Sequence, residues 1–476
     1  MALRISSNNL DRGVRPTQRR PGLRDPIIPG EPGADRFGPQ YQIIVNGTVI
    51  QDSIKSYIEM VEYEDNEDMF DVIKITLRGM IEDPVDKRVK PIPEWVVEST
   101  VFAEGNIVWI QMGYHGSLRI IGAGEIVKRE FDYGTSDPAC TIVCYEPLHR
   151  MANTFADKAI TYKGMRSSDI VKQIARKKEY SGVIGALFDV SKIARLPIFT
   201  PKAEVQKFEE SDYAFLKRMA EVRGWQLYTR FDVETKKFAL FYGPDSDKQE
   251  AIFRYEYNNR NLITEDTLQT FKPIINTIDQ HSEIKIVSVD EKRKKKLEHA
   301  PKYNSLADGR SPVARKFTDR NTDFKKNELK NPVSYRFQAF GLNRRIIATR
   351  PFKDENEVKK FVIQWARNNI KNFITGTGEV VGNEDIQSRQ SHFFFGLGET
   401  FSGTDAHPAK WYLSKVTHVM SKASGGLAYT TKFDCRKVID FLPDDEITAN
   451  PPVQENQKLQ KKAKFNPVAK FAAETE

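Results

Sequence analysis

The chain has 476 residues, a formal net charge of +8, 39% hydrophobic residues and a mean hydropathy of -0.54. At roughly 150 residues per domain this length predicts about three domains, and no apolar run approaches the ~20 residues of a membrane-spanning helix. Three cysteines exclude a disulfide scaffold and a multi-cysteine zinc module, and they fit buried thiols in a reducing compartment. Met1–Arg24 has arginines but no apolar stretch, so we expect no secretory signal there.

Residues 1–38 form a segment dense in Arg, Pro and Gly without an apolar period. Such a segment buries too little apolar surface to order itself. We therefore expect an extended N-terminal arm that orders against a partner.

The pattern from Tyr41 to about His149 indicates β-structure. Asn46-Gly47 lies between two apolar runs, which is a strong hairpin signal. Apolar residues at 73, 75 and 77 alternate with polar ones, as on a half-buried strand. Further strands are predicted at 107–112, 118–131 and 139–145. Strands without a long helix favour a sandwich or a barrel.

Helices enter between about Arg150 and Asn259. Ser167 can cap a helix whose apolar face holds Ile170, Val171, Ile174 and Ala175. Ser211 can cap a second helix, with Phe215, Leu216, Met219 and Ala220 on one face and Gly224 at its end. Strands are predicted at 225–230 and 238–242, so this segment is α+β.

The β pattern returns from about Phe271 to Val438. Strands are predicted around 284–289 and at 393–395, 411–419 and 428–434, and Asp354 with Glu357 predicts the start of a helix. Residues 292–335 are polar, basic and aperiodic, which predicts a long loop or insertion. The last residues, 446–476, are predicted to be a flexible tail. Two β segments around one α+β segment allow an internal duplication.

The sequence contains no motif typical of a catalytic or metal-binding site. None of the seven histidines makes a zinc-type spacing, and the sequence has neither a G-x-S-x-G elbow nor a P-loop. His418 is interpreted as a strand residue with structural partners rather than as a base. We therefore predict no catalytic residue, no bound cofactor and no metal site.

Two charged runs, one acidic and one basic, could bind ions. Glu62–Asp68 lacks the glycine and distal glutamate of a calcium loop, so a solvated loop is the favoured interpretation. Lys292–Lys296 could contact phosphates, but it lacks interleaved aromatic residues. A hairpin tip in solvent is the favoured interpretation of this basic run.

Three sets of segments, in chain order, resemble the phage baseplate-hub and late-control-protein-D family, which includes the base of the type VI secretion spike protein. Cys144–Met151 with Tyr162–Ala175 is similar to the family's passage from its first barrel into a helix. Glu210–Gly224 is similar to its most characteristic helix, an S-D-aromatic-x-F-L-x-R-hydrophobic-A block ending in glycine. The third set comprises the helix after Asp354, Gly398–Gly403, Trp411–His418 and Gly426–Thr431.

This resemblance implies a fold that is α+β and mainly β. Two tube-type β-barrel domains, 39–150 and 271–445, would flank an α+β domain at 151–270. The arm at 1–38, the basic insertion at about 292–335 and the tail at 446–476 would be additions. Three copies would form a homotrimeric ring.

The implied function is that of a non-enzymatic structural baseplate hub of a phage tail or related injection machine. It would adapt the six-fold tail tube to the three-fold central spike and line the channel for DNA ejection. The implied partners are the tail tube protein, the spike protein, tape measure and baseplate wedge proteins, and DNA in transit. The implied location is the virion tail baseplate, after assembly in the host cytoplasm.

Two other classes stay open. A nucleic-acid-binding protein would use the basic region at 292–345, and salt-dependent DNA retention would favour it. A cell-wall hydrolase rests on no specific motif, and turnover of peptidoglycan would favour it.

Overall fold

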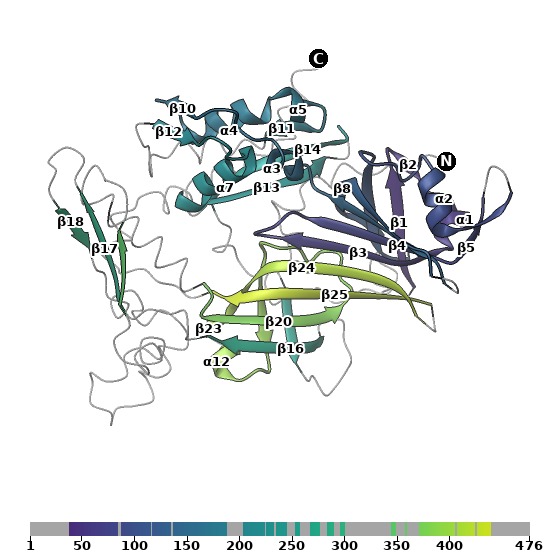
Figure 1. Ribbon diagram of the computed structural model, residues 1–476. Coiled ribbons are helices and arrows are strands. Elements are labelled where there is room, and N and C mark those ends of the chain that lie inside the picture. Colours follow the sequence, from purple (N-terminus) through teal and green to yellow (C-terminus); the bar gives the residue numbers. More distant parts are fainter. Residues whose placement is uncertain are drawn as a thin grey trace, which may run out of the picture. The chain divides into compact units, whose positions relative to one another are not determined.

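The computed structural model describes residues 38–83, 87–115, 117–134, 137–187, 203–223, 225–232, 235–244, 253–257, 267–276, 283–289, 296–299, 344–348, 358, 371–404, 407–423 and 426–438 (Figure 1). Several predictions lie outside these residues: the arm apart from Gly38, the tail, Gly224, most of the insertion, and the helix after Asp354 apart from Val358. The fold is mainly β, with short helices and one large, mostly antiparallel sheet. No helix in the described part is long and apolar enough to span a membrane.

The first β block confirms the predicted strands and adds others. Asn46 and Gly47 have φ values of 48° and 91°, the left-handed conformations of a tight hairpin turn. Alternate residues of β4, Ile73, Ile75 and Leu77, are buried. The elements are β1 (Pro39–Val45), β2 (Thr48–Val49), α1 (Asp52–Lys55), β3 (Ile58–Asn66), β4 (Val72–Arg78), β5 (Met80–Glu82), β6 (Val89–Pro91), α2 (Ile92–Glu98), β7 (Ile107–Tyr114), β8 (Ser117–Asp132) and β9 (Ala139–Tyr145).

The α+β block follows. Ser211 caps α7 as predicted, because its hydroxyl accepts a hydrogen bond from the Ala214 amide at 3.2 Å. The predicted cap at Ser167 is wrong: Arg166 precedes the helix, without a side-chain cap bond. The elements are α3 (Leu148–Ala152), β10 (Ile160–Lys163), α4 (Ser167–Ala175), α5 (Lys178–Ser181), β11 (Ile184–Leu187), β12 (Ala203–Gln206), α7 (Asp212–Arg223), β13 (Trp225–Asp232) and β14 (Lys237–Pro244).

The second β block has a core of aromatic rings. Phe271 meets Trp411 edge-on, with ring centroids 5.0 Å apart, and Phe394 stacks on Phe433 at 5.2 Å. The elements are β15 (Phe253–Tyr257), β16 (Thr267–Ile275), β20 (Ile374–Val381), β21 (Ser391–Phe395), α12 (Glu399–Ser402), β22 (Gly403–Thr404), β23 (His407–Pro408), β24 (Lys410–Ala423) and β25 (Gly426–Lys437).

Between β16 and β20 the chain enters a second compact unit, which holds Thr277–Ile370. Its described strands, β17 (Glu283–Val289), β18 (Lys296–His299) and β19 (Arg344–Ala348), form one sheet. Lys296–His299 was expected in a loop and is instead a strand that pairs antiparallel with β17. Val289 pairs with Lys296, which is hairpin pairing and fits the expected hairpin, while residues 290–295 lie outside the described residues.

The two β blocks share one strand order. Neighbours run β7-β8-β9-β4-β3 in the first block and β21-β24-β25-β20-β16 in the second. Every pair in both runs is antiparallel, and corresponding strands follow in the same order along the chain. A sixth strand flanks each run, β1 antiparallel to β7 and β15 parallel to β21. We call the two runs the first and second modules.

Register irregularities occur at corresponding places in the modules. In the β8–β9 hairpin the irregularity lies between Ile126 and Lys128 of β8, and in the β24–β25 hairpin it lies between Leu413 and Lys415 of β24. In the β3–β4 pair the irregularity lies between Ile58 and Met60 of β3, and in the β16–β20 pair it lies between Leu268 and Thr270 of β16. The modules therefore correspond residue by residue along these strands.

Strand pairing also joins the modules. Met60–Asn66 of β3 pairs antiparallel with Lys415–Ser421 of β24, so one sheet runs through both (Figure 1). Within the second block the pairings from β24 through β21, β15, β16, β20 and β25 return to β24. Met420 and Tyr429 of the β24–β25 hairpin belong to the hydrophobic core of the first block.

Candidate functional site at the junction of three blocks

The acidic segment Glu62–Asp68 lies where the blocks meet. The expectation of a solvated loop is wrong for Glu62–Asn66, because these residues belong to β3 and pair with β24. Each of its five carboxylates meets a cation of the same chain. The pairs are Glu62–Lys74 at 2.9 Å, Glu64–Lys415 at 3.0 Å, Asp65–Arg389 at 2.9 Å, Glu67–Arg436 at 2.5 Å and Asp68–Lys217 at 3.4 Å.

Arg389 is the centre of the junction. It is 8% exposed, and one guanidinium nitrogen donates to Asp65 at 2.9 Å while another donates to the Asn66 carbonyl at 2.6 Å. Its guanidinium lies over the Tyr228 ring at 4.2 Å, and Asp65 also accepts bonds from the amide and hydroxyl of Ser388. Burial alone would lower the pKa of Arg389, but the nearby Asp65 and Asp71 raise it. Arg389 therefore joins the first module to β13 and to the β20–β21 connection as a cation.

Two buried carboxyl groups of the first block face this arginine. Glu146, just after β9, accepts bonds from the Thr229 amide at 3.1 Å and hydroxyl at 2.5 Å. Burial raises the pKa of Glu146 to about 7. Asp71 accepts a bond from the Tyr63 hydroxyl at 3.1 Å, and burial raises its pKa well above the usual range. Glu146 and Asp71 therefore keep their protons at higher pH than exposed carboxyl groups would.

A second contact fixes β25 to the same strand. Arg436 binds Glu67 at 2.5 Å and lies over the Tyr412 ring at 4.0 Å. Gln226 of β13 donates to Glu67 at 2.9 Å. Side chains of the first module, the second module and the α+β block thus share one hydrogen-bonded group.

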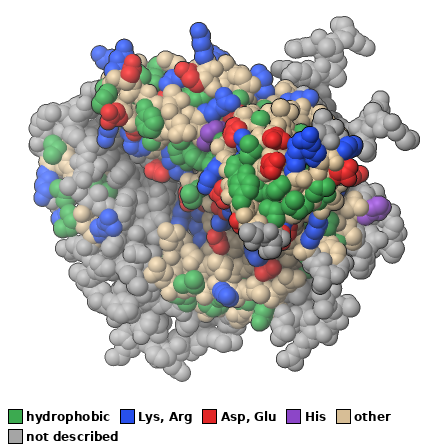
Figure 2. Space-filling view, turned by 45° about the vertical axis from the view of Figure 1, so that its right-hand side comes forward, with side chains coloured by type: hydrophobic (Ala, Val, Ile, Leu, Met, Phe, Trp, Pro, Cys, Tyr) green, Lys and Arg blue, Asp and Glu red, His purple; other side chains and the backbone are tan. Residues whose placement is uncertain are grey.

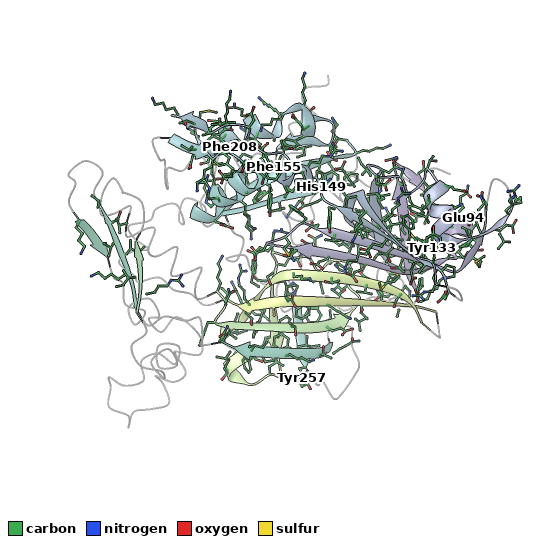
Figure 3. All side chains as sticks on the ribbon, viewed as in Figure 1. Glu94, Tyr133, His149, Phe155, Phe208 and Tyr257 are labelled. Carbon is green, nitrogen blue, oxygen red and sulfur yellow. The ribbon has the colours of Figure 1, made fainter. Side chains whose placement is uncertain are left out.

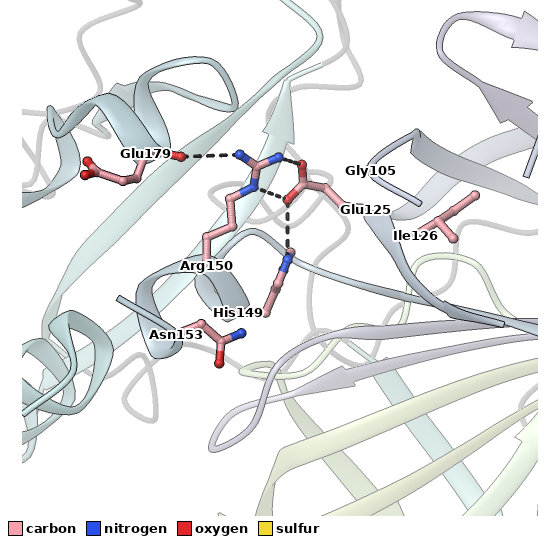
Figure 4. Close-up of a pocket in the computed structure, with 7 residues that line it drawn as sticks. All are labelled: Gly105, Glu125, Ile126, His149, Arg150, Asn153 and Glu179. Atoms are coloured by element: carbon pink, nitrogen blue, oxygen red, sulfur yellow. Dashed lines mark hydrogen bonds and ion pairs between the residues drawn. The ribbon is translucent and has the colours of Figure 1, made fainter. Parts of the chain in front are cut away.

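A third contact ties β8 to the α+β block and borders a surface pocket of about 520 Å³ (Figure 4). Arg150 donates two hydrogen bonds to the buried Glu125 carboxylate, at 2.8 and 2.5 Å, and one to the Glu179 carbonyl at 3.3 Å. His149 Nε2 lies 3.8 Å from Glu125, and its Nδ1 lies 2.9 Å from the Glu146 carbonyl. These groups already bind one another.

The histidine and cysteine positions fit structural roles. His418 is a buried β24 residue, with Nδ1 2.9 Å from the Tyr429 hydroxyl and Nε2 2.9 Å from the Ile386 carbonyl. Burial lowers the pKa of His418 to about 4 and that of His392 to about 3. All three cysteines are buried, and burial raises their pKa values. Within the described ranges, no group of three or more His, Cys, Asp or Glu residues could hold a metal ion.

The sequence did not single out Arg389, Arg436, Glu125 or Glu146. The available signal was the acidic run itself, since carboxylates at successive strand positions point to both faces and those facing inward need a cation. The identity of that cation depends on pairing between strands more than 300 residues apart.

Comparisons with known proteins agree with this fold. No protein-family model and no curated protein matches the sequence. The structure is similar to a tail protein from Neisseria meningitidis MC58, with a TM-score of 0.56 and 11% identity over 86% of this chain and 99% of that one. It is also similar to the 43 kDa tail protein of prophage MuSo2 from Shewanella oneidensis, with a TM-score of 0.54 and 9% identity over 84% of this chain and 98% of that one.

These two proteins define the class of fold: this chain has the fold of the two tail proteins. The resemblance that the sequence motifs indicated is confirmed at that level.

Proposed function

We propose that the protein is a structural baseplate hub of a phage tail or a related injection machine, without enzymatic activity. It adapts a six-fold tail tube to a three-fold central spike. Three copies form the ring, and each copy supplies two tube-type β-barrel domains, one built on each module. Its place is the virion tail baseplate.

The duplicated module carries this proposal. A chain that contains two copies of one strand arrangement offers two similar surfaces, so three chains offer six. The likeness of fold to the two tail proteins covers nearly their whole length, which favours the same class of role. The circuit of pairings in the second block favours a closed barrel there.

The charges of the sheet face that runs through both modules support a channel lining. On the eight strands from β8 to β16, this face carries half-buried or exposed side chains of both charges. A face of balanced charge would let DNA pass without binding its phosphates strongly. These charged residues include Lys74, Arg78, Lys128, Lys272, Lys415, Lys432, Glu62, Glu64, Glu130, Asp132, Glu379 and Asp434.

The junction explains how one chain could act as a rigid adaptor. Buried ion pairs and hydrogen bonds hold the two modules and the α+β block together, so the modules would keep their relative placement under load. The junction groups are engaged with one another, which fits a structural role.

Co-assembly tests the proposal. The purified protein, mixed with the tail tube and central spike proteins of the same tail, should form a complex with three copies of this chain, measured by light scattering after size exclusion. A monomer at every concentration, with both partners present, would contradict the proposed function. Peptidoglycan turnover lost on replacement of His149 or His418, with assembly intact, would instead indicate an enzyme.

A further inference from the structure

Among the described residues, two corresponding strand edges of the modules have no strand paired with them. In the described part of the chain, β15 pairs with β16 at Thr267 and Leu268, and no strand continues along that edge from Thr270 to Ile274. Likewise, β7 pairs with β8 as far as Glu125, and no described strand follows along that edge from Lys128 to Asp132. An open edge exposes backbone donors and acceptors that can pair with another chain.

The counterparts of these two edges pair with each other inside the chain. β16 corresponds to β3 and β8 corresponds to β24, and β3 pairs antiparallel with β24. The joint between the modules is therefore a template for a joint between copies.

We propose that β16 of one copy pairs antiparallel with β8 of a second copy, in the register of the β3–β24 joint. The inference rests on the proposed ring of copies and names its interface. Thr270 of β16 corresponds to Met60 of β3, and Lys128 of β8 corresponds to Lys415 of β24. The register between the copies therefore follows from the residue pairs of the β3–β24 joint. It places Lys272 opposite Asp132 of the second copy, as Glu62 is opposite Val419. It likewise places Ile274 opposite Glu130.

The side chains at the two edges are complementary. In the internal joint the carboxylate of Glu64 on β3 meets Lys415 of β24 at 3.0 Å. The open edges carry the opposite arrangement, with Lys272 on β16 and with Glu130 and Asp132 on β8. Opposite charges across paired strands stabilise the pairing and fix its register.

Exposed apolar side chains accompany both edges. Ile274 and Tyr257 are 54% and 44% exposed beside the β16 edge, and Phe131 and Tyr133 are 38% and 61% exposed beside the β8 edge. Figure 3 labels Tyr257 and Tyr133. On the face shown in Figure 2, hydrophobic side chains gather with basic and acidic ones around them. At the two edges, apolar side chains lie beside charged ones, and such a mixture is typical of an interface between chains.

The contact is heterologous, because two different edges of the chain meet. Heterologous contacts build a closed ring when the rotation between copies closes. A sheet that passes through both modules and across each contact would run around the whole ring.

Mixing two variants that each carry one added cysteine tests the register. Opposite residues in a strand pair have Cβ atoms about 4.5–5.5 Å apart, so Lys272→Cys protein mixed with Asp132→Cys protein should form a disulfide-linked product of twice the chain mass under mild oxidation. The three native cysteines are buried, so they give little background. As a matched control, Lys128→Cys protein replaces the Asp132→Cys protein, because Lys128 lies four residues, or roughly 13 Å, along β8 and beyond the reach of a disulfide.

Charge reversal gives an independent readout. Lys272→Glu should raise the dissociation constant for self-association about tenfold, since it places like charges across the strands. Glu130→Lys with Asp132→Lys should act likewise, and the triple variant should recover most of the affinity. Exchanges at Glu94, an exposed α2 residue, should change nothing.

The outcomes separate the inference from the proposed function. A three-copy assembly in which the Asp132 and Lys128 proteins cross-link equally, or in which the triple variant is the weakest, would overturn the edge pairing and leave the hub role intact. Failure of the wild-type chain to self-associate with its tail partners would refute the hub role itself.

Discussion

Replacing Arg389 by Met should be among the most destabilising single changes in the described part of the chain. The substitution removes the bonds to Asp65 at 2.9 Å and to the Asn66 carbonyl at 2.6 Å, and it removes the contact with the Tyr228 ring. Both side chains of the pair are about nine-tenths buried, at 9% and 11% exposure. Leaving Asp65 buried without its cation should cost about 3–5 kcal/mol of unfolding free energy.

The assay is urea unfolding at pH 7.5, followed by fluorescence. Arg78→Met is the matched control: Arg78 also pairs with two carboxylates, Glu59 at 2.6 Å and Asp137 at 2.7 Å, but these side chains are 42–50% exposed. Solvent weakens such pairs, so the control should change stability little. Equal losses for the two variants would refute the idea that buried charges hold the blocks together.

Three further predictions concern protonation and packing. Because burial raises the pKa of folded Glu146 to about 7, its contribution to stability should be complete at acidic pH and be lost as the pH rises toward 7; Glu146→Gln should remove this slope from unfolding measured between pH 5 and 7.5. Burial instead lowers the pKa of His418 to about 4, so the contribution of the neutral imidazole to stability should be lost as the pH falls from about 6.5 toward 4. His418→Gln should make the unfolding free energy depend less on pH in this range, and light scattering should show that assembly is intact. Gly382→Ala would drive a methyl group into the Tyr429 ring and should cost about 1–3 kcal/mol by thermal unfolding, whereas Gly182→Ala, at an open position with an ordinary negative φ, should meet no such clash.

Sequence reasoning located the elements that local patterns specify. Asn46-Gly47 predicts its hairpin because both residues tolerate positive φ, and the buried face of α7 follows from helical spacing at Phe215, Leu216 and Met219. It missed β3, because charged residues on both faces of that strand hide the alternation of a half-buried strand.

The pairing of the modules was also beyond local patterns. The β3–β24 joint links residues more than 340 positions apart, and the modules share strand order rather than residues. A strand arrangement can recur without sequence similarity, since alternation and burial specify it. The cations Arg389 and Arg436 could therefore be assigned to Asp65 and Glu67 from the structure but not from the sequence.

Electron microscopy of the purified chain, alone and with its tube and spike partners, tests the central claim most directly. The account predicts rings with three-fold symmetry whose walls show six similar densities, two from each copy. Rings in which each copy contributes one density to the channel wall, or particles that stay monomeric with both partners present, would contradict it.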